Sequence, residues 1–406
     1  HHVEQTENPH IDWAYETSAG RGVLWREIEP YPGQFDFSSL DRFIKSYQGK
    51  KIKIWLAIRT VDGLLAPQVD PKVDPWAFRA APKWVGDLGA RWYPCWTGSQ
   101  EKGTLRDAGL FPPWDEVYLN RLRNLLIHVY RHIKNQSSEY QNTIGGIVMM
   151  SGGKHGEMQL WGCRRNYGDQ TDLYGSPLRG KMMTDLGLDP LSLSDMQKFD
   201  ELYYSAVANM IDLYMEIFSD IPVILQLGYN DHNFRNPDQN GREMTVDEAI
   251  IDKKVPQYGS RLLLKWNGLD PTNIGDGRDD VRKRTLAIYQ EIFRRYYHQT
   301  AVGFEIGHPW LFQDPPYSGN WSDDRFIDVF NSALAAKASF VCFQPTMISA
   351  LEDVSGWIQF DQSLEANFFE KEDLKLIIQQ YGPVSYTHLR AHETRHDIVC
   401  RLLLEK

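Results

Sequence analysis

The sequence predicts an α/β fold, a single-domain (β/α)8 TIM barrel, and three observations support this prediction. Short apolar runs rich in β-branched residues alternate with longer runs whose apolar residues recur at helical spacing, which is typical of parallel strands joined by helices. With 406 residues, 42% of them hydrophobic, the chain can bury one large core. No GxGxxG motif follows the first apolar run, so a doubly wound sheet is the weaker alternative.

A series of apolar runs supplies the expected strands of this barrel. The series begins with GVLWREI and ends with FVCFQPT, and no linker or low-complexity segment divides it. Long segments follow two of the runs, at 61–83 and 161–191, and loops after strands are where a barrel builds its site. The expected strands are 22–28, 51–58, 91–96, 144–151, 222–229, 261–268, 301–307 and 340–346. The expected amphipathic helices are 117–133, 199–218, 281–297 and 326–337.

The two ends of the chain differ from its body. The sequence opens with HHVEQ, without a starting Met, and closes with SYTHLRAHETRHDIVCRLLLEK, which resembles translated sequencing adaptor. We therefore expect residues 1–384 to form the catalytic barrel, with truncation at either end left open, and residues 385–406 to be a non-native tail. Such a join is typical of a fragment from metagenome DNA.

Composition and motifs exclude several classes of partner. The net charge is -10 and no basic stripe occurs, so we expect no nucleic-acid partner. No apolar run reaches the length of a membrane span, so we expect a soluble protein of the bacterial cytoplasm or periplasm, or a secreted one. The four cysteines have no CxxC spacing, and no HxH follows the first strand. No HExxH motif occurs in residues 1–384, and the one at 392–396 lies in the tail that resembles sequencing adaptor. Neither a metal nor another cofactor is therefore expected.

Two glutamates follow or end strands on opposite sides of the expected barrel. Glu157 follows the run 144–151 in SGGKHGE, and Glu305 stands inside the apolar run VGFEIG. An unpaired buried carboxylate is costly, so Glu305 is expected to be either paired in an ion pair or functional. Two carboxylates across a barrel mouth can cleave a glycosidic bond, because one protonates the leaving oxygen and the other attacks or activates water. We therefore expect Glu157 and Glu305 to be catalytic.

Aromatic, amide and basic residues near strand ends are the expected substrate-binding residues. Aromatics make up 13% of the chain, and an indole can either fill a core or pack against the apolar face of a pyranose. Arg26 and Arg59 can keep the nucleophile charged or can pair with structural acids. His155 and His308 can donate hydrogen bonds to sugar hydroxyls or can be solvated. The expected residues are Arg26, Arg59, His155, Trp161, Asn230, Trp266, Asn267, His308 and Trp310.

The stretch LWREIEPYPGQFDFSSLDRFI, residues 24–44, gives a more specific indication. It resembles the W-x-x-x-E-P-x-x-G-x-(Y/F)-x-F-x-x-L-D segment after strand one in the family 42 β-galactosidases and their less characterised relatives. These belong to clan A, whose members are retaining (β/α)8 glycoside hydrolases. The resemblance implies that Glu29 and Gly33 shape the first loop, with Glu29 structural. It also implies that Glu157 is the acid/base and Glu305 the nucleophile.

The resemblance has two departures, and they leave the substrate open. Gly156 stands where the clan has Asn before the acid/base, so Asn230 or Asn267 is expected to supply the missing amide. The pair Gln344-Pro345 stands where the eighth strand often ends in Trp. We expect a β-galactosidase that acts on a β-galactoside or on a plant-type oligosaccharide or polysaccharide.

Several alternatives remain open beside this expectation. The same clan includes β-glucosidases, β-mannosidases and xylan-active enzymes. A catalytically inert barrel that binds carbohydrate would also explain the two departures from the clan pattern. A metal-dependent hydrolase using Asp231 and His232 is weaker, because the common metal motifs are missing from residues 1–384. Relatives of this kind often assemble, so a homo-oligomer is left open.

Overall fold

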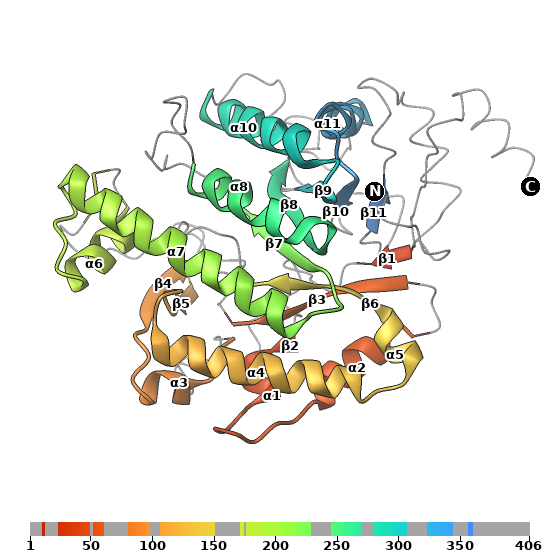
Figure 1. The fold of residues 1–406 in the computed structure, drawn as a ribbon, viewed down its shortest axis with the longest axis horizontal. Helices are drawn as coiled ribbons and strands as arrows, with labels where there is room; N and C mark the ends of the chain where they lie inside the picture. Colours follow the sequence, from red (N-terminus) through yellow and green to blue (C-terminus); the bar gives the residue numbers. More distant parts are fainter. Residues whose placement is uncertain are drawn as a thin grey trace, which may run out of the picture. The chain divides into compact units, whose positions relative to one another are not determined.

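A computed structural model describes residues 10–12, 23–48, 52–60, 80–97, 106–150, 171–173, 176–228, 245–269, 280–306, 323–343 and 356–359 (Figure 1). These residues form an α/β fold in which parallel strands are joined by helices. They group into two compact units, a first unit of residues 14–48 and 56–257 and a second unit of residues 1–13, 49–55 and 258–406. No helix among the described residues is long and apolar enough to cross a membrane.

The register of three strand pairs is described in the first unit. Strand β2 (Val23–Leu24) runs parallel to the end of β3 (Ile52–Arg59), with Leu24 opposite Arg59. Strand β6 (Ile144–Met149) runs parallel to β7 (Val223–Leu227), and all of β7 is buried. Strands β4 (Tyr93–Thr97) and β5 (Arg106–Leu110) pair with each other as an antiparallel hairpin. The buried parallel pairs match the near-continuous apolar runs from which they were predicted.

Four helices of the first unit, α4, α5, α6 and α7, begin at side-chain caps that the sequence supplies. Ser176 caps α6 and Ser192 caps α7, and in each case the hydroxyl accepts a hydrogen bond from a backbone N–H of the first turn. The longest two helices, α4 and α7, lie side by side (Figure 1), and the guanidinium of Arg123 donates to both carboxylate oxygens of Glu216, at 2.9 and 3.2 Å. The helices are α1 (Trp25–Ile28), α2 (Ser38–Lys45), α3 (Lys83–Asp87), α4 (Glu116–Lys134), α5 (Ser138–Thr143), α6 (Pro177–Asp185), α7 (Leu193–Ile217) and α8 (Val246–Tyr258).

The second unit contains a run of paired strands with helices. Strands β8 (Leu262–Leu269), β9 (Val302–Ile306) and β10 (Phe340–Phe343) are parallel neighbours, and β11 (Gly356–Gln359) pairs antiparallel with β10. Strand β1 (His10–Asp12) runs parallel to the first residues of β3. Helices α10 (Asp280–Tyr296) and α11 (Asp323–Ala335) precede β9 and β10, and a short 3-10 helix (Gly259–Arg261) leads into β8. The predicted helices 281–297 and 326–337 are therefore confirmed within three residues at each end.

Two expected barrel strands are corrected by the structure. The run 22–28 is a strand only at Val23–Leu24, because residues 25–28 close a helical turn in which the N–H of Glu29 donates to the carbonyl of Trp25 at 2.8 Å. The run 91–96 was expected to be a parallel barrel strand, but it forms one arm of the β4–β5 hairpin. Pro94 within this run has no N–H to donate to a second neighbouring strand, so the run suits an edge position.

The segment GQFDF after β2 packs on helix α4 and explains part of the opening motif. The ring of Phe35 stacks on His128 and the ring of Phe37 on His132, each with centroids 4.0 Å apart. Four residues separate the histidines on α4, so both lie on one face of the helix. The motif therefore fixes the first βα segment against α4.

Candidate functional site

Glu305 lies on β9, where the sequence predicted a catalytic carboxylate. Only 5% of the residue is exposed, and its Oε2 accepts a hydrogen bond from the Nζ of Lys265 at 3.0 Å. Lys265 lies on the neighbouring strand β8, and none of its side chain is exposed. Two opposite charges buried side by side offset much of the cost of removing each from water. Glu305 is thus held next to a cation in the interior of the second unit.

The register of the two strands places a third polar side chain beside this pair. Lys265 is opposite Gly303, and Asn267 is opposite Glu305. Because side chains two residues apart in a strand point to the same face, Lys265, Asn267 and Glu305 share one face of the β8–β9 pair. Asn267 and Glu305 lie toward the carboxyl ends of their parallel strands, which is the edge where α/β folds bind ligands. We call these three residues the β8–β9 polar cluster.

Trp266 lies on the opposite face of the same strand. Its ring is fully buried, stacks on Tyr289 of α10 with centroids 4.9 Å apart, and meets Phe304 edge-on at 5.8 Å. A sugar platform needs one exposed ring face, and none of Trp266 is exposed. The expectation that Trp266 binds substrate therefore has no support from its position, which is that of a core residue.

The other expected residues divide into two groups. Arg59 is fully buried at the end of β3. Arg26 is half-buried on α1, and its backbone N–H donates to the backbone carbonyl of Ala80 at 3.0 Å. Both arginines belong to the first unit, whereas the β8–β9 polar cluster belongs to the second. The remaining expected residues lie outside the described part of the chain: His155, Glu157, Trp161, Asn230, His308 and Trp310.

Glu29 has the structural contacts that the family resemblance implies. Its buried carboxylate accepts from the Nε1 of Trp25 at 3.0 Å and from the N–H of Gly33 at 2.9 Å. Its carbonyl accepts from the Nε1 of Trp84 at 3.1 Å. Gly33 has a φ of 73°, a conformation that favours glycine. Glu29 and Gly33 therefore close the first loop on itself.

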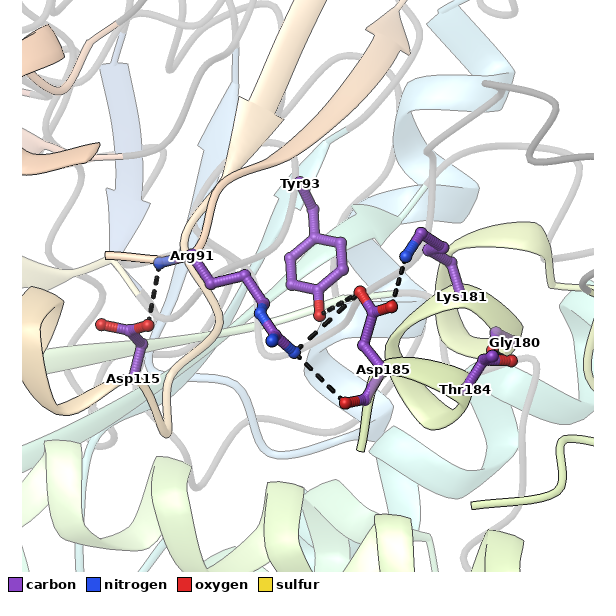
Figure 2. Close-up of polar contacts among 7 residues, drawn as sticks. All are labelled: Arg91, Tyr93, Asp115, Gly180, Lys181, Thr184 and Asp185. Atoms are coloured by element: carbon purple, nitrogen blue, oxygen red, sulfur yellow. Dashed lines mark hydrogen bonds and ion pairs between the residues drawn. The ribbon is translucent and has the colours of Figure 1, made fainter. Parts of the chain in front are cut away.

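A polar network fastens helix α6 to the segment around β4 (Figure 2). The carboxylate of Asp185 forms an ion pair with Lys181 and accepts a hydrogen bond from the Oη of Tyr93 at 3.1 Å. The guanidinium of Arg91 donates to the backbone carbonyl of Asp185 at 3.4 Å. Partial burial works to raise the pKa of Asp185, but the bonds from Lys181 and Tyr93 outweigh it and lower the pKa. Burial raises the pKa of Tyr93 to about 12, so the phenol remains a donor. The network is a structural anchor for α6.

Lys265 is a buried partner of Glu305 that the sequence analysis did not name. The signal was a lysine inside an apolar run, RLLLKWNG, because a buried lysine needs a partner just as a buried glutamate does. Among the described residues, no group of three or more metal-ligating side chains comes together. The chemistry available in the β8–β9 polar cluster is therefore that of a carboxylate, an ammonium and an amide.

Comparisons with known proteins add a set of similar structures. No protein-family model matches the chain, and no curated protein matches it. The chain is similar to the catalytic domain of a β-amylase from Paenibacillus polymyxa, with 13% identity and a TM-score of 0.45 over 71% of this chain and 78% of that chain. It is also similar to a β-galactosidase from the psychrophilic Marinomonas ef1, with 13% identity and a TM-score of 0.43 over 79% of this chain and 48% of that chain.

A third similar structure is the exo-β-1,4-mannosidase Op5Man5 from Opitutaceae bacterium strain TAV5. Here the identity is 12% and the TM-score 0.35, over 78% of this chain and 43% of that chain. The chain thus spans less than half of the mannosidase and of the β-galactosidase. All three similar proteins are glycoside hydrolases by name. With TM-scores below 0.5, these similarities do not assign the chain to a family.

Proposed function

We propose that the chain is a glycoside hydrolase that cleaves β-glycosidic bonds with retention, and that its substrate is a β-galactoside. The observation that carries the proposal is the placement of Glu305, a buried carboxylate beside an ammonium at 3.0 Å, toward the carboxyl end of a parallel strand. A nucleophile must be ionised, and the adjacent positive charge of Lys265 favours the ionised form. We also propose that residues 1–384 form one closed (β/α)8 barrel.

In the proposed reaction, two carboxyl groups act in two steps. Glu305 attacks the anomeric carbon and forms an ester while the bond to the leaving oxygen breaks, and Glu157 gives its proton to that oxygen. Glu157 then takes a proton from water, whose oxygen attacks the anomeric carbon and releases the Glu305 carboxylate. This sequence requires carboxyl groups about 5 to 5.5 Å apart, whereas a separation of about 6.5 to 9.5 Å would give inversion.

Asn267 is the best-supported substrate-binding residue. It is half-buried and shares a strand face with Glu305, so its amide can bond a sugar hydroxyl next to the reacting carbon. This placement supports the expectation that Asn267 replaces the amide lost at Gly156. The remaining proposed substrate-binding residues are Arg26, Arg59, His155, Trp161, Asn230, His308 and Trp310.

A specific observation also favours a second candidate, an inert carbohydrate-binding barrel. A carboxylate buried inside a strand needs a cationic partner even if it has no catalytic role, and the Lys265–Glu305 ion pair provides that partner. In an inert barrel the pair would stabilise the fold and nothing more. Removing Glu305 would then weaken folding without removing any hydrolysis.

An aryl glycoside panel tests the proposed function. The 4-nitrophenyl β-galactoside, β-glucoside, β-mannoside and β-xyloside are incubated with the wild type and with the variants E305Q and E157Q. We expect release of 4-nitrophenol from the galactoside and its loss in E305Q. We expect the activity of E157Q on the 4-nitrophenyl galactoside to fall by about 10²- to 10⁴-fold. The fall should be smaller on a dinitrophenyl glycoside, because its leaving group needs no proton.

The matched control is Glu291→Gln on α10, which makes the same change in the exposed ion pair between Glu291 and Arg295. Its activity is expected to equal that of the wild type. Binding of galactose without hydrolysis of any of the four glycosides would instead support the inert barrel.

A further inference from the structure

A buried ionisable cluster joins the first turn of α6 to helix α7. The Nη2 of Arg179, on α6, donates to the Oδ1 of Asp200, on α7, at 2.7 Å, and the Nε of Arg179 lies 3.2 Å from the Oδ2 of Asp172. Each of the three residues is less than a tenth exposed. We call them the Asp200 cluster. We propose that this cluster is a pH-sensitive switch: α6 stays packed on α7 while Asp200 holds a proton, and α6 opens away from α7 more often when Asp200 has lost it.

The cluster also holds the turn from which α6 begins. The Oδ1 of Asp172 accepts from the N–H of Ser176 at 2.7 Å, and the N–H of Asp172 donates to the carbonyl of Ser176 at 3.2 Å. The hydroxyl of Ser176 accepts from the N–H of Arg179 at 3.4 Å, and the guanidinium of Arg179 lies 5.5 Å from the ring centroid of Phe199 on α7. Arg179 therefore connects α6 both to α7 and to the turn before α6.

The proton of Asp200 decides how much charge is buried between the two helices. Burial raises the pKa of Asp200 to about 6, with Arg179 opposing the rise and the charge of Asp172 adding to it. Below pH 6 the buried group is a neutral carboxyl, which costs less to bury than a carboxylate. Above pH 6 a carboxylate is held away from water. Because Arg179 contacts this carboxylate, moving α6 away from α7 would return it to water.

Two other carboxylates on these helices titrate in more acidic solution. Against partial burial, the bonds from Lys181 and Tyr93 lower the pKa of Asp185 at the end of α6. The bond with Lys198 lowers the pKa of Asp195 in the first turn of α7. Asp185 and Asp195 therefore stay ionised between pH 5 and pH 7, the range in which Asp200 loses its proton.

The direction and size of the effect follow from linkage. With α6 open, Asp200 is in water and recovers its ordinary pKa of 3.8, so the open form loses the proton at lower pH than the closed form. The equilibrium constant for opening therefore rises with pH between pH 4 and pH 6 and is constant at higher pH. The difference of about 2 pKa units limits the whole rise to roughly 100-fold.

Hydrogen–deuterium exchange followed by mass spectrometry tests the proposal. The wild type and Asp200→Asn are labelled at pH 5, 6 and 7, with and without a low concentration of urea, and each rate is divided by that of the unfolded chain at the same pH. In peptides from α6 of the wild type, we expect the corrected exchange to rise by roughly 10-fold from pH 5 to pH 7. Asp200→Asn has no proton to lose there, so its exchange should not rise.

Urea separates opening of α6 from unfolding of the whole protein. Opening one short helix exposes little surface, so exchange in α6 should depend weakly on urea, whereas exchange through global unfolding depends strongly on it. Peptides from α4 provide the comparison within the same molecule. Asp195→Asn is the matched control, because it makes the same change on α7 at a carboxylate that stays ionised in this range, and it should show the pH dependence of the wild type.

Three outcomes would overturn the inference. Exchange in α6 of the wild type that is equal at pH 5 and pH 7 would show that the proton of Asp200 does not control the opening. A rise that persists in Asp200→Asn would assign the effect to another group. Exchange in α6 with the same strong urea dependence as in α4 would show that α6 does not open by itself. The first and third outcomes need only the wild type, so they apply even if Asp200→Asn does not fold.

Discussion

Asp200 is expected to make the protein less stable at neutral pH than in mild acid. It lies on α7 in a buried cluster with Asp172 and Arg179. The Nη2 of Arg179 donates to Asp200 at 2.7 Å, and the Nε of the same arginine lies 3.2 Å from Asp172. Two carboxylates therefore share one guanidinium. Burial raises the pKa of Asp200 to about 6, and the charge of Asp172 acts in the same direction, against the attraction of Arg179.

The size of the effect follows from that shift. The pKa rises from 3.8 to about 6, a difference of about 2 units, and each unit corresponds to about 1.4 kcal/mol. Between pH 4 and pH 6 the native protein holds the proton of Asp200 while the unfolded chain has lost it. The free energy of unfolding therefore falls as the pH rises through this window, by roughly 3 kcal/mol in total. Above pH 6 the contribution of Asp200 no longer changes.

Urea unfolding at pH 4, 5, 6 and 7 checks this prediction in the wild type and in Asp200→Asn. The variant has no charge to titrate, so its free energy of unfolding relative to the wild type should rise by about 3 kcal/mol from pH 4 to pH 7. The control is Asp195→Asn on the same helix, because the hydrogen bond with Lys198 lowers the pKa of Asp195. A difference between wild type and D200N that is independent of pH would refute the reasoning.

Three further changes test other parts of the structure. A Cβ at Gly303 would lie 2.3 Å from the ring of Phe340, so G303A should lower the free energy of unfolding by about 1–3 kcal/mol in thermal unfolding. A Cβ at Gly86 would meet open space, so the control G86A should lower it by less than half of that. Glu29→Ala removes two accepted hydrogen bonds and should cost about 1–3 kcal/mol in urea unfolding; no loss would contradict its structural role. The lowered pKa of Asp185 contributes stability above pH 4 that is lost in acid, so D185N should lose less stability than the wild type from pH 5 to pH 2.

The regular elements of the fold could be predicted from sequence periodicity. Helix α4 differs from the predicted range by one residue at each end, and β8 by one residue as well. Both have a strong apolar repeat and a clear boundary signal, such as Asp115 at the N-cap of α4. The helical turn at Trp25–Ile28 could not be predicted in this way, because a side-chain bond from Trp25 to Glu29 replaces strand pairing there.

The site could be predicted only in part, because register is not visible in one sequence. Lys265 and Glu305 are 40 residues apart, and their contact depends on how β8 and β9 align. Trp266 and Asn267 are neighbours in a strand, so their side chains point to opposite faces of the sheet. Asn267 shares the face of Glu305, and this leaves Trp266 for the core.

Azide rescue of Glu305→Ala tests the central claim most directly. The variant is mixed with 2,4-dinitrophenyl β-galactoside with and without sodium azide, and the product is identified by NMR. If Glu305 is the nucleophile of a retaining enzyme, the variant is inactive alone, and azide restores turnover with an α-galactosyl azide as product. A β-galactosyl azide would give Glu305 the acid/base role instead. Activity in Glu305→Ala equal to the wild type without azide would contradict the account altogether.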